Sequence, residues 1–197
     1  SKRSRTFSSL TSLSHLDLSN NSISSLTLEA APSFTSLVSL KHLNLTSNQI
    51  DSAEVLSCMV HLEELFLGSN KLEHIDLPEM SSLKVLLLHN NSLRSLGPWI
   101  KNMVSLEVLD VRSNRIKSLD ECEELPLSIT KLLLDGNQIK GFPQLFSVPL
   151  PNLVHLSANY NPIEEVGDMI SNLSNLNYLS LASAHITSIS PFIKTLT

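Results

Sequence analysis

The sequence predicts an elongated solenoid of stacked repeats, and three features of its 197 residues support this prediction. One motif, L-x-x-L-x-L-x-x-N-x-L/I, recurs eight times in phase. Its asparagines are spaced 21 to 27 residues apart, a period typical of repeat architectures. Hydrophobic residues make up 42% of the chain but aromatic residues only 5%, so leucine, isoleucine and valine must build the core.

Each copy of the motif predicts one short strand. The copies are LSHLDLSNNSI, LKHLNLTSNQI, LEELFLGSNKL, LKVLLLHNNSL, LEVLDVRSNRI, ITKLLLDGNQI, LVHLSANYNPI and LNYLSLASAHI. A single strand cannot bury its leucines, but stacked copies bury a continuous core, with parallel strands about 4.8 Å apart.

The asparagine of each copy lies just past its strand, where the chain turns into the interior. The pattern asparagines are Asn21, Asn48, Asn70, Asn91, Asn114, Asn137 and Asn161, with Ala184 in the eighth place. An amide side chain can satisfy backbone groups that such a turn would otherwise bury unpaired. We therefore assign these asparagines a structural role and exclude them from any binding site.

The motif resembles the leucine-rich repeat family over nearly the whole chain. This resemblance implies an α/β fold, a right-handed solenoid curved like a horseshoe, with a parallel β-sheet on the concave face. Short helical or extended segments would form the convex face. The segments NSLRSLGPWIKNMVSL and NPIEEVGDMISNLSNL resemble the 23-residue class found in intracellular scaffold and regulator proteins. The longer first gap, around LTLEAAPSFTSL, predicts a longer convex loop or a helical turn.

Residues 1–197 are expected to form a single domain of about eight repeats. Ala184 marks a degenerate last repeat, and the tail SPFIKTLT stops where another repeat could begin. We therefore expect this domain to be part of a longer protein.

Composition and motifs argue against several classes of function. The net charge of −5 is not that of a nucleic-acid-binding protein. No apolar run approaches the roughly 18 residues of a membrane span, so direct membrane insertion is not expected. The sequence lacks G-x-x-x-x-G-K-S/T, H-E-x-x-H and paired C-x-x-C motifs, so we expect neither an enzyme nor a cofactor.

Histidine and cysteine spacing argues against a metal and against a disulfide. His15, His42 and Glu64 share one repeat position and have side chains that zinc accepts, but a straight column does not converge on one ion. Cys58 and Cys122 lie three repeats apart, roughly 14 Å at strand spacing, whereas bridged cysteines need Cα atoms within about 7 Å. Secreted proteins of this kind usually carry more cysteines in pairs, which favours a cytoplasmic over an extracellular location.

Strand alternation predicts which side chains face outward on the concave sheet. The third, fifth and seventh positions of the motif should face out. In the central repeats these positions hold the apolar residues Phe66, Val85, Leu87, Val108 and Leu133, surrounded by the polar residues Glu64, His89, Asp110, Arg112 and Lys131. An apolar centre within a charged rim is typical of protein interfaces, so these ten residues are the expected binding site for another protein or peptide.

The main hypothesis is therefore a protein–protein interaction module, either an adaptor or scaffold or a regulatory subunit. A fragment of an extracellular receptor ectodomain and a structural spacer in a cytoskeletal or flagellar assembly are the alternatives. The apolar outward residues have two further explanations, which are strand propensity alone and cover by another segment of the full protein.

Overall fold

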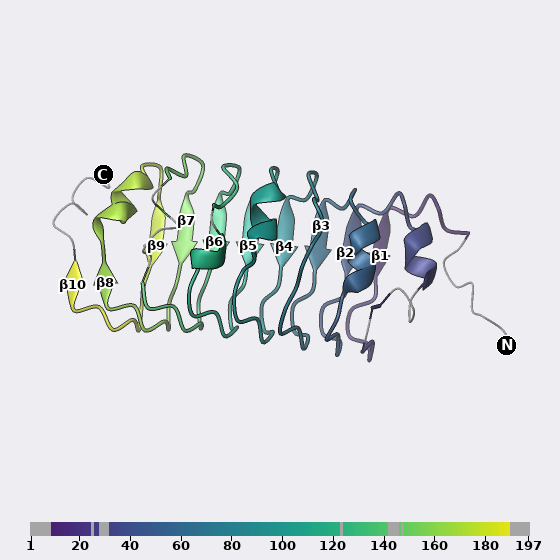
Figure 1. The fold of residues 1–197 in the computed structure, drawn as a ribbon, viewed down its shortest axis with the longest axis horizontal. Coiled ribbons are helices and arrows are strands. Elements are labelled where there is room, and N and C mark those ends of the chain that lie inside the picture. Colours follow the sequence, from purple (N-terminus) through teal and green to yellow (C-terminus); the bar gives the residue numbers. More distant parts are fainter. Residues whose placement is uncertain are drawn as a thin grey trace.

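The structure is a computed structural model of the chain, and it describes residues 9–24, 26–27, 32–122, 124–141, 146 and 148–189. Within these residues the chain winds as a solenoid with a sheet along one side, and the strands follow one another in sequence order (Figure 1).

Eight strands of three residues each form one parallel sheet. They are β1 (His15–Asp17), β2 (His42–Asn44), β3 (Glu64–Phe66), β4 (Val85–Leu87), β5 (Val108–Asp110), β6 (Lys131–Leu133), β7 (His155–Ser157) and β9 (Tyr178–Ser180). Each lies within one copy of the motif, and the same motif positions pair across every neighbouring strand. The expected parallel sheet and its register are therefore confirmed.

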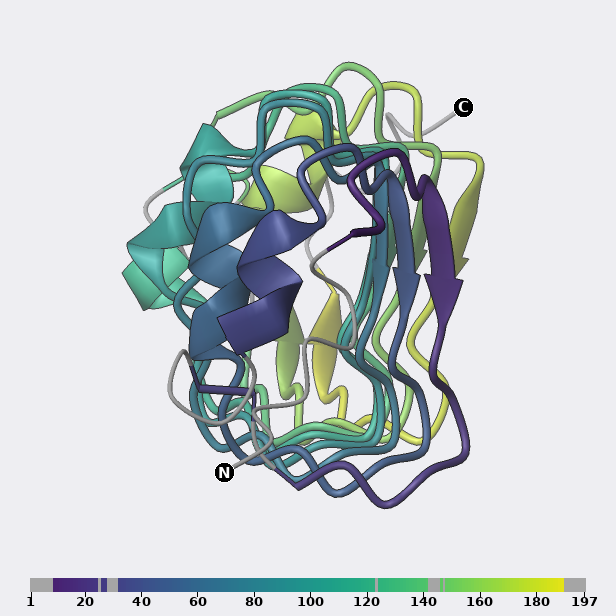
Figure 2. The same ribbon diagram turned by 90° about the vertical axis from the view of Figure 1, so that its right-hand side faces the viewer.

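Short 3-10 helices lie on the side opposite the sheet (Figure 2). They are η1 (Pro32–Ser36), η2 (Glu54–Cys58), η3 (Pro98–Asn102), η4 (Asp120–Cys122) and η5 (Asp168–Asn172). Helix η1 confirms a helical turn in the long first gap, although residues 28–31 of that gap lie outside the described residues. The short segment between β3 and β4 carries no helix, and all of its residues are described.

A second, two-stranded sheet was not expected from the sequence. Strands β8 (Glu165–Val166) and β10 (Ser188–Ile189) pair in parallel and lie beside the last repeats (Figure 1). Each lies four and five residues after the asparagine position of its repeat, so the extended backbone past the turn continues the stacking of successive repeats.

The leucines of the motif fill the space between the sheet and the helices. Leu65 and Leu67 of the third repeat have no exposed surface, and neither do Leu86 and Leu88 of the fourth. Fully burying one leucine contributes roughly 1.5–3 kcal/mol, so the stacked leucine layers dominate the stability of the solenoid.

The asparagines form a ladder of hydrogen bonds along one edge of the sheet. Asn114 is typical, since its amide Nδ2 donates to the carbonyls of Leu88 and Val111 at 3.0 and 2.9 Å. Its Oδ1 accepts the backbone N–H of Leu93 in the preceding repeat, at 2.9 Å. Asn48, Asn70, Asn91, Asn137 and Asn161 make the equivalent acceptor bond to the repeat before. Their structural role is therefore confirmed.

Residues just before the asparagine position adopt left-handed backbone. They are Asn20, Ser47, Ser69, Asn90, Ser113, Gly136, Tyr160 and Ser183, with φ between 53° and 66°. This conformation reverses the chain direction after the strand and is uncommon for residues other than glycine, asparagine and aspartate. Tyr160 is the one large side chain among these eight, and its side chain points out of the turn, 68% exposed.

The two cysteines lie on the helical side, and neither forms a disulfide. Cys58 is exposed at the end of η2, whereas Cys122 is buried at the end of η4 with its Sγ 3.5 Å from the carbonyl oxygen of Leu96.

Candidate functional site

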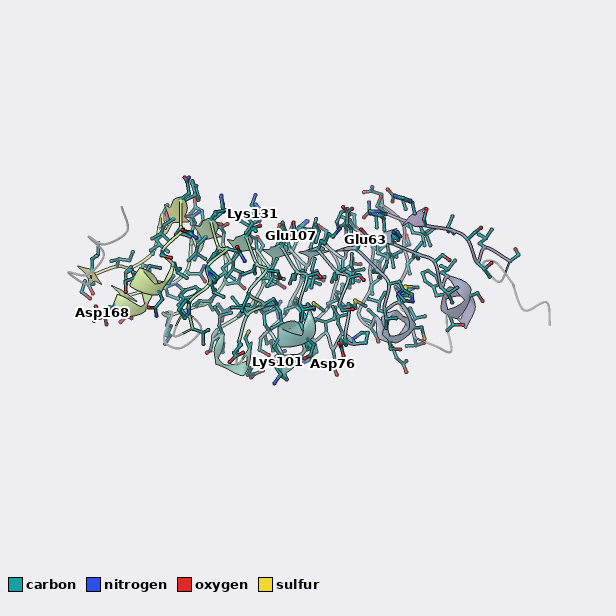
Figure 3. All side chains as sticks on the ribbon, turned by 90° about the horizontal axis from the view of Figure 1, so that it is seen from above. Glu63, Asp76, Lys101, Glu107, Lys131 and Asp168 are labelled. Carbon is teal, nitrogen blue, oxygen red and sulfur yellow. The ribbon has the colours of Figure 1, made fainter. Side chains whose placement is uncertain are left out.

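The concave face of the sheet carries the residues that the sequence singled out. Figure 3 shows the sheet side curving gently inward, with Glu63, Glu107 and Lys131 along it and Asp76, Lys101 and Asp168 along the helical side. Outward residues at the third and fifth motif positions stand in columns that cross the strands, because the register pairs the same position in every repeat.

Four apolar side chains meet at the middle of this face. Phe66 pairs with Leu87 across β3 and β4, and Val85 pairs with Val108 across β4 and β5. All four are half-buried, while the leucines beside them in the same strands are fully buried. The inside–outside phase of the prediction is therefore correct, and we call these four residues the apolar centre.

Two of the expected site residues offer almost no surface to a partner. Leu133 is only 8% exposed and Asp110 only 2%, although both stand at outward positions. The next residue in their column, Ser157, is also buried, so neighbours on strands about 4.8 Å apart cover one another here. The expectation that Leu133 and Asp110 are accessible is wrong.

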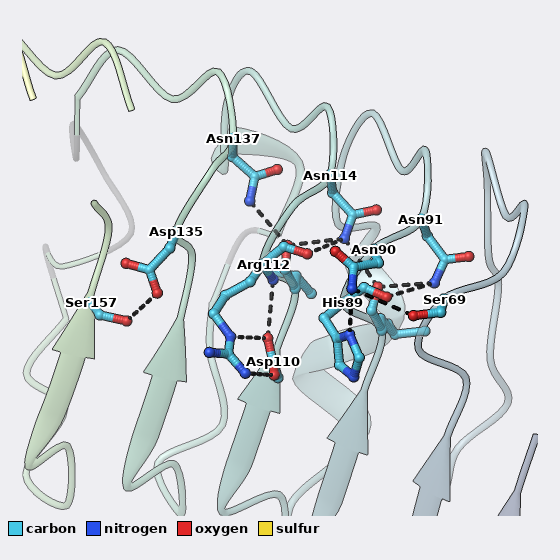
Figure 4. Close-up of polar contacts among 12 residues, drawn as sticks. Ser69, His89, Asn90, Asn91, Asp110, Arg112, Asn114, Asp135, Asn137 and Ser157 are labelled. Atoms are coloured by element: carbon cyan, nitrogen blue, oxygen red, sulfur yellow. Dashed lines mark hydrogen bonds and ion pairs between the residues drawn. The ribbon is translucent and has the colours of Figure 1, made fainter. Parts of the chain in front are cut away.

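Asp110 instead fixes the side chain of Arg112. Its carboxylate accepts hydrogen bonds from Arg112 Nε at 2.9 Å and Nη2 at 2.7 Å, and from the backbone N–H of Arg112 at 3.1 Å (Figure 4). The guanidinium thus contacts both carboxylate oxygens. Asp110 in turn raises the pKa of Arg112, so this side chain presents a fixed, partly exposed cation.

Opposite charges flank the two valines of the apolar centre. The third-position column runs Glu64, Val85, Val108, Lys131 across four neighbouring strands. Glu64 also lies 3.0 Å from Nδ1 of His42, measured from its Oε2. The column is therefore acidic at one end of the apolar centre and basic at the other.

Aromatic stacking occupies both ends of the concave face. The rings of His15 and His42 stack with centroids 4.0 Å apart, and those of His155 and Tyr178 with centroids 4.2 Å apart. Burial and the neighbouring Lys131 lower the pKa of His155. No three histidine, cysteine, aspartate or glutamate side chains among the described residues are grouped as a metal site would require.

A shallow pocket of about 480 Å³ opens where β4 to β7 end, and we call it the edge pocket. It is lined by His89, Asn90, Arg112, Ser113, Asp135, Gly136 and Tyr160. His89 and Arg112 were expected at the binding site, whereas the contribution of Asn90, Ser113, Gly136 and Tyr160 was missed. These four hold the left-handed position before the asparagine, and the large Tyr160 at that place is the signal that could have revealed them.

Charged residues at the opposite edge of the sheet neutralise one another. Glu63 lies 2.8 Å from Lys41 and 3.3 Å from Lys84, each measured between a carboxylate oxygen and Nζ. Lys41 and then Lys84 lower the pKa of Glu63 through these contacts. Such exposed pairs contribute little to stability, and here they leave the edge without a strong field.

Comparison with known proteins agrees with this geometry. A family model described as Leucine Rich repeats (2 copies) matches residues 11–58 and again residues 81–126. No curated protein matches the chain in sequence. Together, the family match, the repeated motif and the parallel sheet show that this chain contains leucine-rich repeats.

Solved structures show the same fold. A leucine-rich repeat protein of Leptospira interrogans superposes with a TM-score of 0.65 at 26% identity, over 93% of this chain and 58% of that one. An internalin of Listeria monocytogenes superposes with a TM-score of 0.58 at 23% identity, over 95% of this chain and 66% of that one. This chain thus spans less than two thirds of each of these two proteins, and the second likeness shows the fold alone.

The described residues contain no helix of the length and apolar character needed to cross a bilayer.

Proposed function

We propose that this chain is a protein–protein interaction module that binds a partner protein or peptide on the concave face of its sheet and carries out no chemistry. The observation that carries this proposal is the apolar centre. Four half-exposed apolar side chains from three adjacent strands meet there, at positions where the fold itself needs no hydrophobic residue.

The scaffold supports this role because it holds the apolar centre rigidly. Each strand is hydrogen-bonded to its neighbours and anchored by buried leucines, so binding orders few additional groups. Preorganisation of this kind lowers the entropic cost of association. Phe66 and Leu87 are the anchors in this proposal, since large apolar side chains near the middle of an interface tend to dominate its energetics.

The charges around the apolar centre suggest how a partner lies. Glu64 and Lys131 are separated by three strand spacings, roughly 14 Å. A bound segment with a basic residue over Glu64 and an acidic residue over Lys131 would bind in one direction only. His89 and Arg112 contribute from the side of the edge pocket.

We further propose an intracellular setting for this interaction. The chain has two cysteines, and the structure joins neither of them in a disulfide. Paired cysteines are the usual support of small secreted domains, which favours a reducing compartment.

Peptide selection tests the proposed function without a known partner. A random peptide library displayed on phage is selected on the 197-residue chain, and dissociation constants of the selected peptides are measured. We expect Phe66→Glu and Leu87→Glu each to weaken binding by at least tenfold, because a carboxylate would face an apolar ligand surface. Val104→Glu is the matched control, since Val104 is 62% exposed and lies outside the sheet. Peptides that lose affinity for Val104→Glu but keep it for Phe66→Glu would overturn the proposal.

A further inference from the structure

Three exposed cations cluster where the chain leaves β5 and β6. They are Arg115, Lys117 and Lys140, and we call them the basic edge. Arg115 and Lys117 flank the buried Ile116, and Lys140 follows the buried Ile139, so extended backbone directs all three side chains outward.

Side chains at matching positions of neighbouring repeats stand next to one another along this edge. The ion pair of Arg94 with Glu73, 2.9 Å between Nη2 and Oε2, joins one such position in two successive repeats. The next two repeats place Lys117 and Lys140 in the same column, and the repeat after them places Glu164 there, with its backbone N–H 3.4 Å from the carbonyl oxygen of Lys140. The backbone pairs these turns directly, since the N–H of Gln138 donates to the carbonyl of Ile116 at 2.8 Å.

The cations of the basic edge have no counter-ion within the part of the chain that the structure describes. Arg94 is neutralised by Glu73, but no described carboxylate lies within 4.0 Å of Arg115, Lys117 or Lys140. Like charges held side by side on neighbouring segments of the chain repel one another, as they do between paired strands. At the other edge of the sheet, Glu63 separates two lysines. Ion pairing within the described residues therefore does not explain the basic edge.

The edge pocket lies close to one of these cations along the chain. Ser113 lines the pocket and Arg115 is two residues further along, so their Cα atoms are at most about 7 Å apart. Asp135 is the one carboxylate that lines the pocket, and both of its oxygens are occupied. One oxygen accepts a hydrogen bond from Ser157 Oγ at 2.7 Å (Figure 4). The other accepts one from the backbone N–H of Asn159, also at 2.7 Å.

We propose that an acidic segment of a partner protein binds along the edge pocket and the basic edge. Its carboxylates pair with Arg115, Lys117 and Lys140, and its backbone lies beside Tyr160 and the polar groups of the pocket. The size of the surface favours a peptide over a nucleic acid. The basic edge holds three cations, and from Lys117 to Lys140 is one repeat spacing, about 5 Å, whereas a nucleic-acid site typically neutralises about 6–10 phosphates. The net charge of −5 also repels a long polyanion beyond this edge.

This second surface does not depend on the apolar centre, and its test uses a separate probe. A fluorescein-labelled hexaglutamate peptide is titrated with the 197-residue chain, and fluorescence anisotropy is recorded at about 10 mM and about 150 mM salt, where the Debye length falls from roughly 30 Å to 8 Å. We expect saturable binding at low salt that weakens at high salt. The double variant Lys117→Gln/Lys140→Gln should bind the peptide roughly tenfold more weakly.

Two controls distinguish peptide binding at the basic edge from a general effect of the protein's charge. Lys41→Gln/Lys84→Gln removes the same two charges from the opposite edge and should leave the affinity unchanged within about twofold. Phe66→Glu tests independence from the proposed concave site, and it should also retain hexaglutamate binding. The proposal is overturned by equal losses in the two double variants, by the absence of saturable binding at low salt, or by tighter binding of a thymidine hexanucleotide than of hexaglutamate.

Discussion

Arg112 and Asp110 form a two-pronged ion pair within a single turn of the solenoid. Nε and Nη2 of the guanidinium lie 2.9 and 2.7 Å from the two carboxylate oxygens (Figure 4). The carboxylate is buried at 2% exposure, whereas the arginine side chain is 46% exposed. Asp110, which the sequence analysis placed on the binding surface, therefore holds the side chain of Arg112 in position.

Removing the Arg112 guanidinium should destabilise the fold, because the buried carboxylate of Asp110 would lose its ion-pair partner. We expect Arg112→Met to lower the free energy of unfolding by about 1–3 kcal/mol, because Asp110 would keep only its backbone hydrogen bond. Urea denaturation of the wild type and the variant measures this difference. Asp110→Asn combined with Arg112→Met should recover part of the loss, and a double variant less stable than Arg112→Met alone would contradict the assignment.

Neighbouring residues of β3 should respond in opposite ways to substitution. Leu65 is fully buried, so Leu65→Ala should cost about 2–5 kcal/mol in unfolding free energy. Phe66 is half-buried on the concave face, so Phe66→Glu should cost less than about 1.5 kcal/mol, part of the value for a fully buried side chain. Thermal unfolding of both variants checks the order. If Phe66→Glu proves the more destabilising, the side chain is part of the core and not of a site.

The asparagine ladder ends at Ala184, which offers a test by restoration. The N–H of Ile163 has no asparagine side chain opposite it and donates instead to the carbonyl of Asn161 at 2.8 Å. Ala184→Asn should supply the missing acceptor and raise the free energy of unfolding by about 0.5–1.5 kcal/mol. Asn114→Ala should lower it by about 2–4 kcal/mol, since several buried backbone groups lose their partner at once. A destabilised Ala184→Asn would show that the last repeat is not built like the others.

Most of the fold, but only part of the site, could be predicted from the sequence. The leucine periodicity predicted where the strands lie. The pairing of Phe66 with Leu87 could also be predicted, because each repeat contacts mainly its neighbours. The burial of Asp110 could not be predicted, since the motif does not show that its carboxylate pairs with Arg112. The edge pocket was also missed. Several of its residues lie in left-handed turns, and such turns are usually recognised in a sequence by glycine, whereas here residues such as Tyr160 form them. The pairing of β8 with β10 could not be predicted, because no position of the motif indicates a second sheet.

The titration of His155 tests the electrostatics at the basic end of the concave face. Its pKa is lowered from 6.5, first by burial and then by Lys131, so its NMR titration midpoint should lie below 6.5. Since the unfolded chain then binds a proton more readily than the folded chain, stability should fall as pH drops through 6.5 toward the folded pKa. Lys131→Gln should raise the midpoint, and an unchanged midpoint would mean that Lys131 does not face this ring.

The most direct test of the central claim is a methyl NMR spectrum of the chain with and without a bound peptide obtained by selection. The claim is that the apolar centre of the concave face is where a partner binds. We expect the methyl signals of Val85, Leu87 and Val108 to shift on binding, while those of Val38 and Val104, which are exposed outside the sheet, stay in place. Shifts confined to Val38 and Val104, with the three concave methyl groups unchanged, would contradict the claim.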